Sequence, residues 1–351
     1  MNIYMKKTKK YRIKFQKSLD RRPRLCYSHK RQEQFLSHLT KVRVKKMKKF
    51  SKYLCILLCL AMLFALAACG SNSDANLSKA YDKYLSQLKP GGANGTLTVA
   101  MSPDFAPQEF YDVAKSGDDA IVGFDVLLSN YLAQELYMNL VIKPMSFDAV
   151  QAAVQTGNAD IGISGFSWTY ERAQNYEITD YYIAGDNETV QSIICLKENE
   201  GKFTSPEDFV GYKIGYQGAS LQQILVEETF GDLDVDISLV YVDLGTAVEA
   251  LKAKQVDFLA VAHGNGESII ANANDSIAFT GFDFEVDEIY KNNVCLIQKG
   301  NTELLEKVNA ALAKALENDY YSGWYDACKV YAGVSTLDEL GFDADGNKIT
   351  E

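Results

Sequence analysis

From Thr96 onward, the alternation of apolar and polar positions predicts the order strand, helix, strand, helix, strand. The expected strands are short runs rich in apolar and β-branched residues: 96–101, 140–145 and 159–164. Between them, apolar residues recur at helical spacing over 125–137, and again from Ser146, the expected helix cap, to Gly157. This order is typical of an α/β unit with a largely parallel sheet.

The same alternation starts again near residue 190 and predicts a second unit of similar size. Its expected strands are again short apolar runs: 191–196, 212–216, 239–242 and 256–261. Helices are expected after Ser205-Pro206, from Ser220 to Gly231, and after the capping-box pattern Thr246–Glu249. A further strand at 293–298 precedes a helix from Asn301, which needs a sheet to cover.

An export signal precedes these units. Three lysines near Met47 lead into 13 consecutive apolar residues, Leu54 to Leu66, and then into Leu66-Ala67-Ala68-Cys69. A basic segment, a short apolar segment and small residues at the end are the parts of a secretory signal peptide. The apolar run is short for a membrane span, which needs roughly 20 residues. Leu-Ala-Ala-Cys also resembles the bacterial lipobox, which implies cleavage before Cys69 and lipid on its sulfur.

Charge divides the chain at the same place. Residues 1–53 carry 19 Lys and Arg and two acids, whereas the rest carries 17 Lys and Arg and 44 Asp and Glu. The exported part is therefore strongly acidic, which argues against nucleic-acid binding because phosphate requires a basic face. We interpret residues 1–46 as a translated leader upstream of a true start at Met47.

Few residues offer catalytic or metal chemistry. The exported part contains one histidine, His263, and no Cys-x-x-Cys pair, so a Cys/His metal site is not expected. Cys195 and Cys295 lie in strand-like apolar runs and are expected to be buried, although an exported protein also permits a disulfide among Cys195, Cys295 and Cys328. No nucleophile elbow, phosphate loop or dinucleotide fingerprint occurs, and no cofactor is expected.

One residue points to binding. From Cys69 to the C-terminus the chain has 16 lysines but a single arginine, Arg172, in the stretch ISGFSWTYER. The stretch combines a strand end, a small-residue turn and a helix start near Thr169, where free backbone N–H groups attract anions. Ser167 adds a hydroxyl, and a guanidinium fork matches a carboxylate in a way that lysine does not. The competing interpretation is an ordinary surface charge.

Six stretches together resemble one family, the family 3 extracellular solute-binding proteins of polar amino-acid uptake transporters. Over residues 96–333, in order, they resemble the family's signatures: APQEF (106–110), GFDVLLSNYLA (123–133), PMSFDAVQAAVQTGNAD (144–160), SGFSWTYERAQNYEITDYY (164–182), YKIGYQGAS (212–220) and KGNTELLEKVNAALAKAL (299–316). Leu127 replaces the second acid of one signature. The resemblance implies a two-lobed, hinged fold of the type II periplasmic-binding-protein kind, with mixed, largely parallel sheets and a ligand between the lobes.

The resemblance also implies roles for individual residues. Arg172 and Ser167 would hold a ligand carboxylate, and Ala219 with Ser220, at a helix start in the second lobe, would close on it. The carbonyl at Gly165, in the Ser164-Gly165 turn, would accept from an amino group. The aromatic walls expected on either side of the ligand are Phe105 and Phe147.

The chain departs from the family where an ammonium would bind. The family usually has an aspartate where this chain has Ala262, and often another where it has Ser102. Either His263, Asn265 or Glu267 substitutes from a shifted loop, or the ligand has no α-ammonium. A solvated loop is the ordinary interpretation for His263 and Glu267.

The expected organisation follows the resemblance. The segments are a leader (1–46), a signal peptide (47–68), a lipidated tether containing a short helix (69–95), lobe 1 (96–188 and 291–333), lobe 2 (189–290) and a polar tail (334–351). The expected function is that of a monomeric, lipid-anchored receptor that delivers an amino acid or related carboxylate to an ABC permease. An enzyme of the same fold, such as a dehydratase, and a sensory receptor without a permease are the alternatives.

Overall fold

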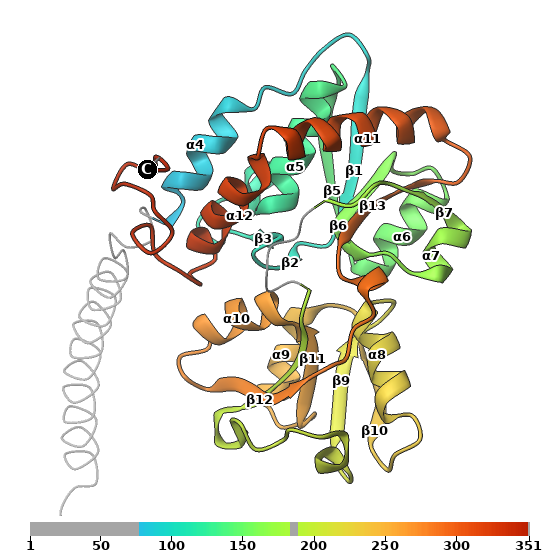
Figure 1. Cartoon of the computed structure of the whole chain (residues 1–351), viewed down its shortest axis with the longest axis vertical. Helices are drawn as coiled ribbons and strands as arrows, with labels where there is room; N and C mark the ends of the chain where they lie inside the picture. The colour runs from blue at the N-terminus through green and yellow to red at the C-terminus, as the bar shows by residue number, and fades with distance from the viewer. Residues whose placement is uncertain (1–76, 183–188, 350–351) are drawn as a thin grey trace, which may run out of the picture. The chain divides into compact units, whose positions relative to one another are not determined.

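Two five-stranded sheets organise the part of the chain that the computed structural model describes, residues 77–182 and 189–349 (Figure 1). All of these residues belong to one unit, Asn72–Glu351. The predicted leader (1–46), the signal peptide (47–68) and Cys69 lie outside the described residues. Within the described ranges, no helix has both the length and the apolar character that crossing a membrane requires.

The first sheet has the strand order β5-β1-β6-β13-β7. Its strands are β1 (Thr96–Met101), β5 (Asn139–Pro144), β6 (Ile161–Ser167), β7 (Tyr176–Ile178) and β13 (Asn293–Gln298). β1 runs parallel to β5 and β6, whereas β13 runs antiparallel to β6 and β7. The late strand β13 thus completes a sheet that the first half of the chain began. A small sheet lies beside it: β2 (Asp104–Phe105), β3 (Glu109–Tyr111) and β4 (Ile121–Val122).

The second sheet has the order β10-β9-β11-β8-β12 and the same mixture of pairings. Its strands are β8 (Gln191–Leu196), β9 (Lys213–Gln217), β10 (Asp236–Tyr241), β11 (Phe258–Ala262) and β12 (Ile277–Asp283). β9 runs parallel to β10 and β11, and β8 runs antiparallel to β11 and β12. We call the first sheet with its helices lobe 1 and the second lobe 2.

Helices cover both faces of each sheet. Lobe 1 carries α4 (Lys79–Gln87), α5 (Phe124–Glu135), α6 (Phe147–Gln155), α7 (Tyr170–Asn175), α11 (Thr302–Glu317) and α12 (Tyr320–Tyr331), and lobe 2 carries α8 (Leu221–Phe230), α9 (Leu244–Lys252) and α10 (His263–Ala271). Successive side chains of β1 point to opposite faces, so Val99 packs in the core beneath α5 while Ala100 packs beneath α6. The two-lobed α/β architecture with mixed sheets is confirmed.

Several predicted helix ends are also confirmed. Ser220 caps α8, where its hydroxyl accepts from the Gln223 backbone, and Gly231 ends that helix. Asn301 caps α11 by accepting from the Leu304 backbone.

Other local predictions were wrong. Ser205-Pro206 opens only a 3-10 turn, Pro206–Phe209, although its capping box is present. The cap of α9 is Asp243 rather than Thr246, because α9 begins earlier and the Asp243 carboxylate accepts from the Thr246 backbone. His263 and Glu267, for which a loop was the ordinary interpretation, lie in helix α10 (His263–Ala271).

The segments that flank the two units take part in the packing of lobe 1. α4 is the short helix expected between residues 69 and 95, and its Tyr81 ring lies 5.1 Å from the Tyr331 ring of α12. The C-terminal residues are not wholly a solvated tail, because Phe342 is buried in a cluster with Ala80 and Val330. The boundaries predicted at 188/189 and 290/291 stay predictions, and the first of them touches residues 183–188, outside the described ranges.

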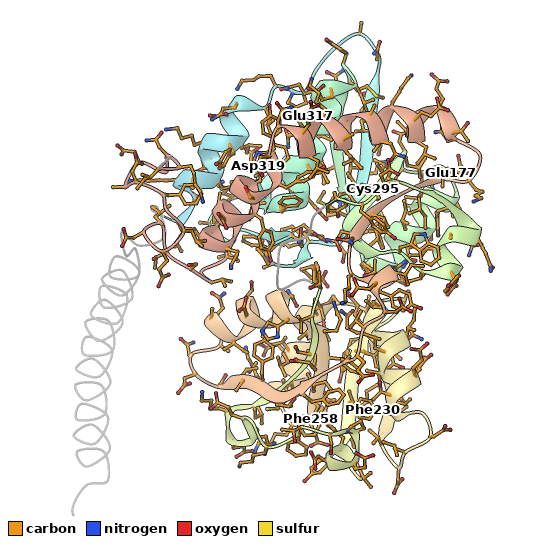
Figure 2. All side chains as sticks on the ribbon, in the orientation of Figure 1. Glu177, Phe230, Phe258, Cys295, Glu317 and Asp319 are labelled. Carbon is orange, nitrogen blue, oxygen red and sulfur yellow. The ribbon has the colours of Figure 1, made fainter. Side chains whose placement is uncertain are left out.

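A cluster of aromatic side chains forms one core of lobe 2. Figure 2 labels Phe258 of β11 and Phe230 of α8 within it. The Phe209 ring lies 4.9 Å from Phe258 and 5.3 Å from Phe230, in edge-to-face geometry with both. Such pairs add to the stabilisation that burial provides.

Phe258→Ala is therefore expected to lower the free energy of unfolding by about 3–5 kcal/mol, through lost burial and a cavity. Denaturant unfolding followed by fluorescence measures this. Val113→Ala is the control, because Val113 is 98% exposed and its truncation should change stability by less than about 0.5 kcal/mol. Equal effects of the two substitutions would contradict this packing.

Candidate functional site

A cavity of ≈ 30 Å³ lies where the carboxyl end of β6 and the start of α7 in lobe 1 meet the start of α8 in lobe 2. Its wall contains residues from both lobes: Phe105, Phe147, Ser164, Gly165, Ser167, Arg172, Gln191, Gln217, Ser220, Leu221, Gln222, Ala262 and Asn293. This volume is the space open to the centre of a water-sized sphere, and one water needs about 10–15 Å³ of it. The cavity therefore holds only about two waters in this conformation.

Arg172 is the charged side chain in this wall, and it is 4% exposed. Its Nη1 donates to the Ser167 carbonyl at 2.6 Å, its Nη2 to the Ala219 carbonyl at 2.8 Å, and its Nε to Gln151 Oε1 at 3.4 Å. All three acceptors are neutral. Burial lowers the pKa of Arg172 to about 10, so the guanidinium stays charged at neutral pH. A desolvated cation without a carboxylate partner among these contacts is a site for an anion.

Aromatic rings surround the guanidinium. Its Cζ lies 5.6 Å from the centre of the Phe147 ring and 5.0 Å from that of Phe166. Phe105 approaches the backbone of Gly165, where an added Cβ would lie 2.7 Å from Phe105 Cε1. Gly165 also has a φ of +55°, so both the turn and the close approach favour glycine here.

The start of α8 faces the same cavity from lobe 2. The Ser220 hydroxyl is already engaged, because it donates to the Gln217 carbonyl and accepts from the Gln223 backbone. Ser220 and Leu221 therefore offer the cavity the backbone N–H end of a ten-residue helix rather than a free hydroxyl. Ala219 has a left-handed φ of 60°, and its carbonyl accepts the hydrogen bond from Arg172 that joins the lobes.

Two buried acids stand behind the first-lobe wall. The Ser164 hydroxyl donates to Glu109, and the Gly165 backbone donates to Asp125 Oδ2 at 2.9 Å. The Tyr182 hydroxyl also donates to Asp125, at 3.2 Å. Burial raises the pKa of Glu109 well above its usual value, and the adjacent Asp125 raises it further. Burial likewise raises the pKa of Asp125 to about 6.

A proton on Glu109 explains this pair. Glu109 Oε2 and Asp125 Oδ1 are buried oxygens with no other hydrogen-bond partner in the described ranges. A neutral Glu109 that donates to Asp125 satisfies both atoms. The pair fixes Ser164 and Gly165, and with them the backbone that faces the cavity.

The sequence-predicted residues fall into two groups. Seven of them line the cavity: Phe105, Phe147, Ser164, Gly165, Ser167, Arg172 and Ser220. Ala219 contacts Arg172 through its carbonyl and lies just outside the wall. His263 and Glu267 are not in the wall.

His263 and its neighbours in α10 have other contacts. The His263 ring stacks on Phe279 at 4.2 Å, and its Nδ1 lies 2.8 Å from Ser192 Oγ. Asn265 is 2% exposed and donates to the Ala106 carbonyl of lobe 1 at 3.0 Å. The shifted loop that was considered as a source of ammonium ligands is thus a helix with packing contacts.

Five residues of the wall were missed from the sequence: Gln191, Gln217, Leu221, Gln222 and Asn293. Asn293 pairs with Ser167 across β13 and β6, so its place depends on long-range strand register. No local signal distinguishes it from any other strand residue. Leu221 and Gln222, by contrast, directly follow the predicted cap Ser220, so their place at the cavity could have been predicted from that cap.

Arg172 also borders a groove of ≈ 450 Å³ whose wall contains Glu171, Ala219, Ser220 and Glu227. A groove farther away lacks comparable chemistry. A groove of ≈ 730 Å³ between α5 and α11 contains Glu135 and Lys314, which pair with each other at 2.6 Å on the surface. Exposed charges that pair with each other need no ligand to balance them. Across the described ranges, no group of three or more His, Cys, Asp or Glu side chains is placed to hold a metal ion, and Cys195, Cys295 and Cys328 are buried free thiols.

The acid pair predicts a pH dependence of stability. Unfolded Glu109 ionises above its usual pKa of 4.5, whereas the folded chain keeps its proton to a much higher pH. The folded state therefore binds more protons at Glu109, and the contribution of this group to the free energy of unfolding falls as pH rises from about 5 to 8. Glu109→Gln keeps a donor toward Asp125 but removes this titration. The free energy of unfolding of Glu109→Gln minus that of the original protein should therefore increase by more than about 1 kcal/mol between about pH 5 and pH 8.

Denaturant unfolding at several pH values measures this difference. Glu171→Gln is the matched control, since Glu171 is exposed and lies outside the pair. The free energy of unfolding of Glu171→Gln should change with pH as that of the original protein does. Parallel curves for Glu109→Gln and the original protein would contradict a proton held on Glu109.

Comparisons with known proteins agree with this geometry. The family model for bacterial extracellular solute-binding proteins, family 3, matches residues 97–201. The L-cystine-binding protein TcyJ of Escherichia coli (strain K12) is 30% identical over 223 residues, which cover 63% of this chain and 77% of that protein. The arginine-binding extracellular protein ArtP of Bacillus subtilis (strain 168) is 26% identical over 270 residues, covering 76% of this chain and 93% of that protein.

A solved structure extends the likeness to the whole two-lobed fold. The amino acid ABC transporter substrate-binding protein AbpA from Streptococcus pneumoniae Canada MDR_19A, bound to L-arginine, superposes with a TM-score of 0.60 at 28% identity. The match covers 73% of this chain and 100% of that one. The chain belongs to the bacterial extracellular solute-binding proteins, family 3.

Proposed function

We propose that this protein captures an amino acid or a related small carboxylate between its lobes and delivers it to the permease of an ABC importer. It acts outside the cytoplasm as a monomer and is held at the membrane by lipid on Cys69. Relatives named for binding L-cystine and arginine support the class of ligand. Arg172 is the residue that would hold the ligand carboxylate.

The state of Arg172 carries this proposal. A fully charged guanidinium lies buried between two lobes and donates only to neutral acceptors. A ligand carboxylate would replace two of those acceptors with a charge-assisted, bidentate pair. The N–H end of α8 then faces the same carboxylate from lobe 2, so that both lobes hold one ligand group.

Further contacts between the lobes support closure around a ligand. Asp104 of lobe 1 accepts from Gln217 Nε2 and from the Leu244 backbone of lobe 2, each at 2.9 Å. Since the cavity has room for only about two waters, the lobes would separate for a ligand to enter. Within the described residues, the chain returns from lobe 2 to lobe 1 between β12 and β13, and a hinge would bend there.

Within the part of the chain that the structure describes, Ser192, His263 and Asp283 form the candidate cluster for the enzyme alternative. Here the serine hydroxyl donates to Asp283 and also contacts His263, whereas His263 Nδ1 lies 4.0 Å from Asp283. In a catalytic triad the histidine stands between the serine and the acid. Ser192 is also fully buried. This order and burial favour a structural hydrogen-bond network, so we propose binding without turnover.

Replacing Arg172 tests the carboxylate clamp. Arg172→Lys keeps the positive charge but loses the fork that matches a carboxylate. One or two charge-assisted hydrogen bonds contribute roughly 1.5–3 kcal/mol each. Affinity should therefore fall by roughly tenfold to ten-thousandfold. Titration calorimetry measures this with the best-binding member of a panel of common amino acids and 2-hydroxy acids.

Asn175→Ala is the control for that substitution. Asn175 is an exposed residue of the same helix and does not line the cavity, so its variant should bind as the original protein does. Unchanged affinity in Arg172→Lys would end the carboxylate-clamp proposal.

The lipid anchor is tested separately. If Cys69 is the lipidated N-terminus, mass spectrometry of the membrane fraction should find no peptide from residues 1–68, and Cys69→Ala should move the protein out of that fraction. Membrane-bound protein that retains residues 47–68 would reject the anchor without affecting the ligand site.

A further inference from the structure

The described residues that form the cavity wall include one cation and no carboxylate. Arg172 is the cation. Four carboxamide side chains also line the wall: Gln191, Gln217, Gln222 and Asn293. Such a wall forms hydrogen bonds with neutral groups of a ligand but offers no negative charge to a ligand ammonium.

Three buried carboxylates behind the wall, Asp104, Glu109 and Asp125, face protein donors rather than the cavity. Asp104 accepts from Gln217 Nε2 at 2.9 Å, from the Leu244 backbone at 2.9 Å and from Ser102 Oγ at 2.8 Å. Glu109 and Asp125 lie one layer behind the wall, bonded to Ser164 and Gly165. Each of these acids is therefore separated from a ligand by a neutral group.

Asn293 adds an independent observation. This side chain is 7% exposed, lines the cavity, and has a buried Nδ2 with no hydrogen-bond partner in the described part of the chain. Buried polar groups in folded proteins nearly always have a partner. An oxygen acceptor on the ligand would supply one, whereas an ammonium there would face another donor.

We propose that the ligand is a small carboxylate whose other polar groups are uncharged acceptors, and that it lacks an ammonium or other cation. A 2-hydroxy or 2-oxo acid has this chemistry. The inference rests on the proposed function, because both require a ligand carboxylate that neutralises Arg172. An α-ammonium would restore an unpaired positive charge in a closed, buried site, which is costly.

Ala262 provides a direct way to test this. It is the N-cap residue of α10, makes no side-chain cap hydrogen bond, is 2% exposed and lines the cavity. Asp and Asn are both favoured at helix N-caps and have nearly the same shape. Ala262→Asp therefore adds a carboxylate to the wall, and Ala262→Asn adds the same bulk without the charge.

The experiment is titration calorimetry with the common amino acids that carry a primary amine, each beside the 2-hydroxy acid with the same side chain. The original protein should bind the hydroxy acid of its best pair at least about tenfold more tightly than the amino acid. Ala262→Asp should reduce or reverse that ratio by about tenfold or more, because an ammonium gains a charge-assisted partner. Ala262→Asn should leave the ratio unchanged.

Equal or tighter binding of the amino acid by the original protein would overturn the inference, as would binding of neither member of any pair. These results differ from a failure of the proposed function. If Arg172→Lys abolishes binding of a preferred amino acid, the carboxylate clamp stands and only the absence of an ammonium is wrong. If Arg172→Lys binds as the original protein does, the clamp itself is wrong.

Discussion

The two-lobed structure depends on one buried positive charge. Arg172 extends from a short helix of lobe 1 to the Ala219 carbonyl of lobe 2. Its hydrogen-bond acceptors are all neutral, and an aromatic ring lies beside it. Taking a cation out of water is expensive unless an anion balances it. The closed arrangement is therefore incomplete by one negative charge, and a ligand carboxylate is the natural source of it.

The remainder of the site supports that charge. Burial of Glu109 and Asp125, which share a proton, fixes Ser164 and Gly165 on the lobe 1 side. The cap at Ser220 fixes the N–H end of α8 on the lobe 2 side. Because both walls are held by their own hydrogen bonds, closing the lobes orders few additional groups, and preorganisation of this kind lowers the cost of binding.

Local signals in the sequence predicted much of the fold, and the family resemblance supplied most of the predicted residues of the cavity wall. Features that depend on tertiary contacts were missed. Ser220, Asn301 and the strand runs follow short-range rules of capping and alternation. Helix α10 was missed because Gly264 and Gly266 argue against a helix, yet an added Cβ at Gly266 would lie 2.7 Å from Phe279 Cε1, so close packing requires glycine there. Asn293 reaches the cavity only through the register of β13 on β6, which no local pattern encodes.

The central claim is that a carboxylate balances Arg172 when the lobes close. Mass spectrometry of the small molecules released by denaturing freshly purified protein tests it most directly, since it needs no prior choice of ligand. The account predicts one released compound per protein that carries a carboxylate. A stoichiometric ligand without any acidic group would contradict it.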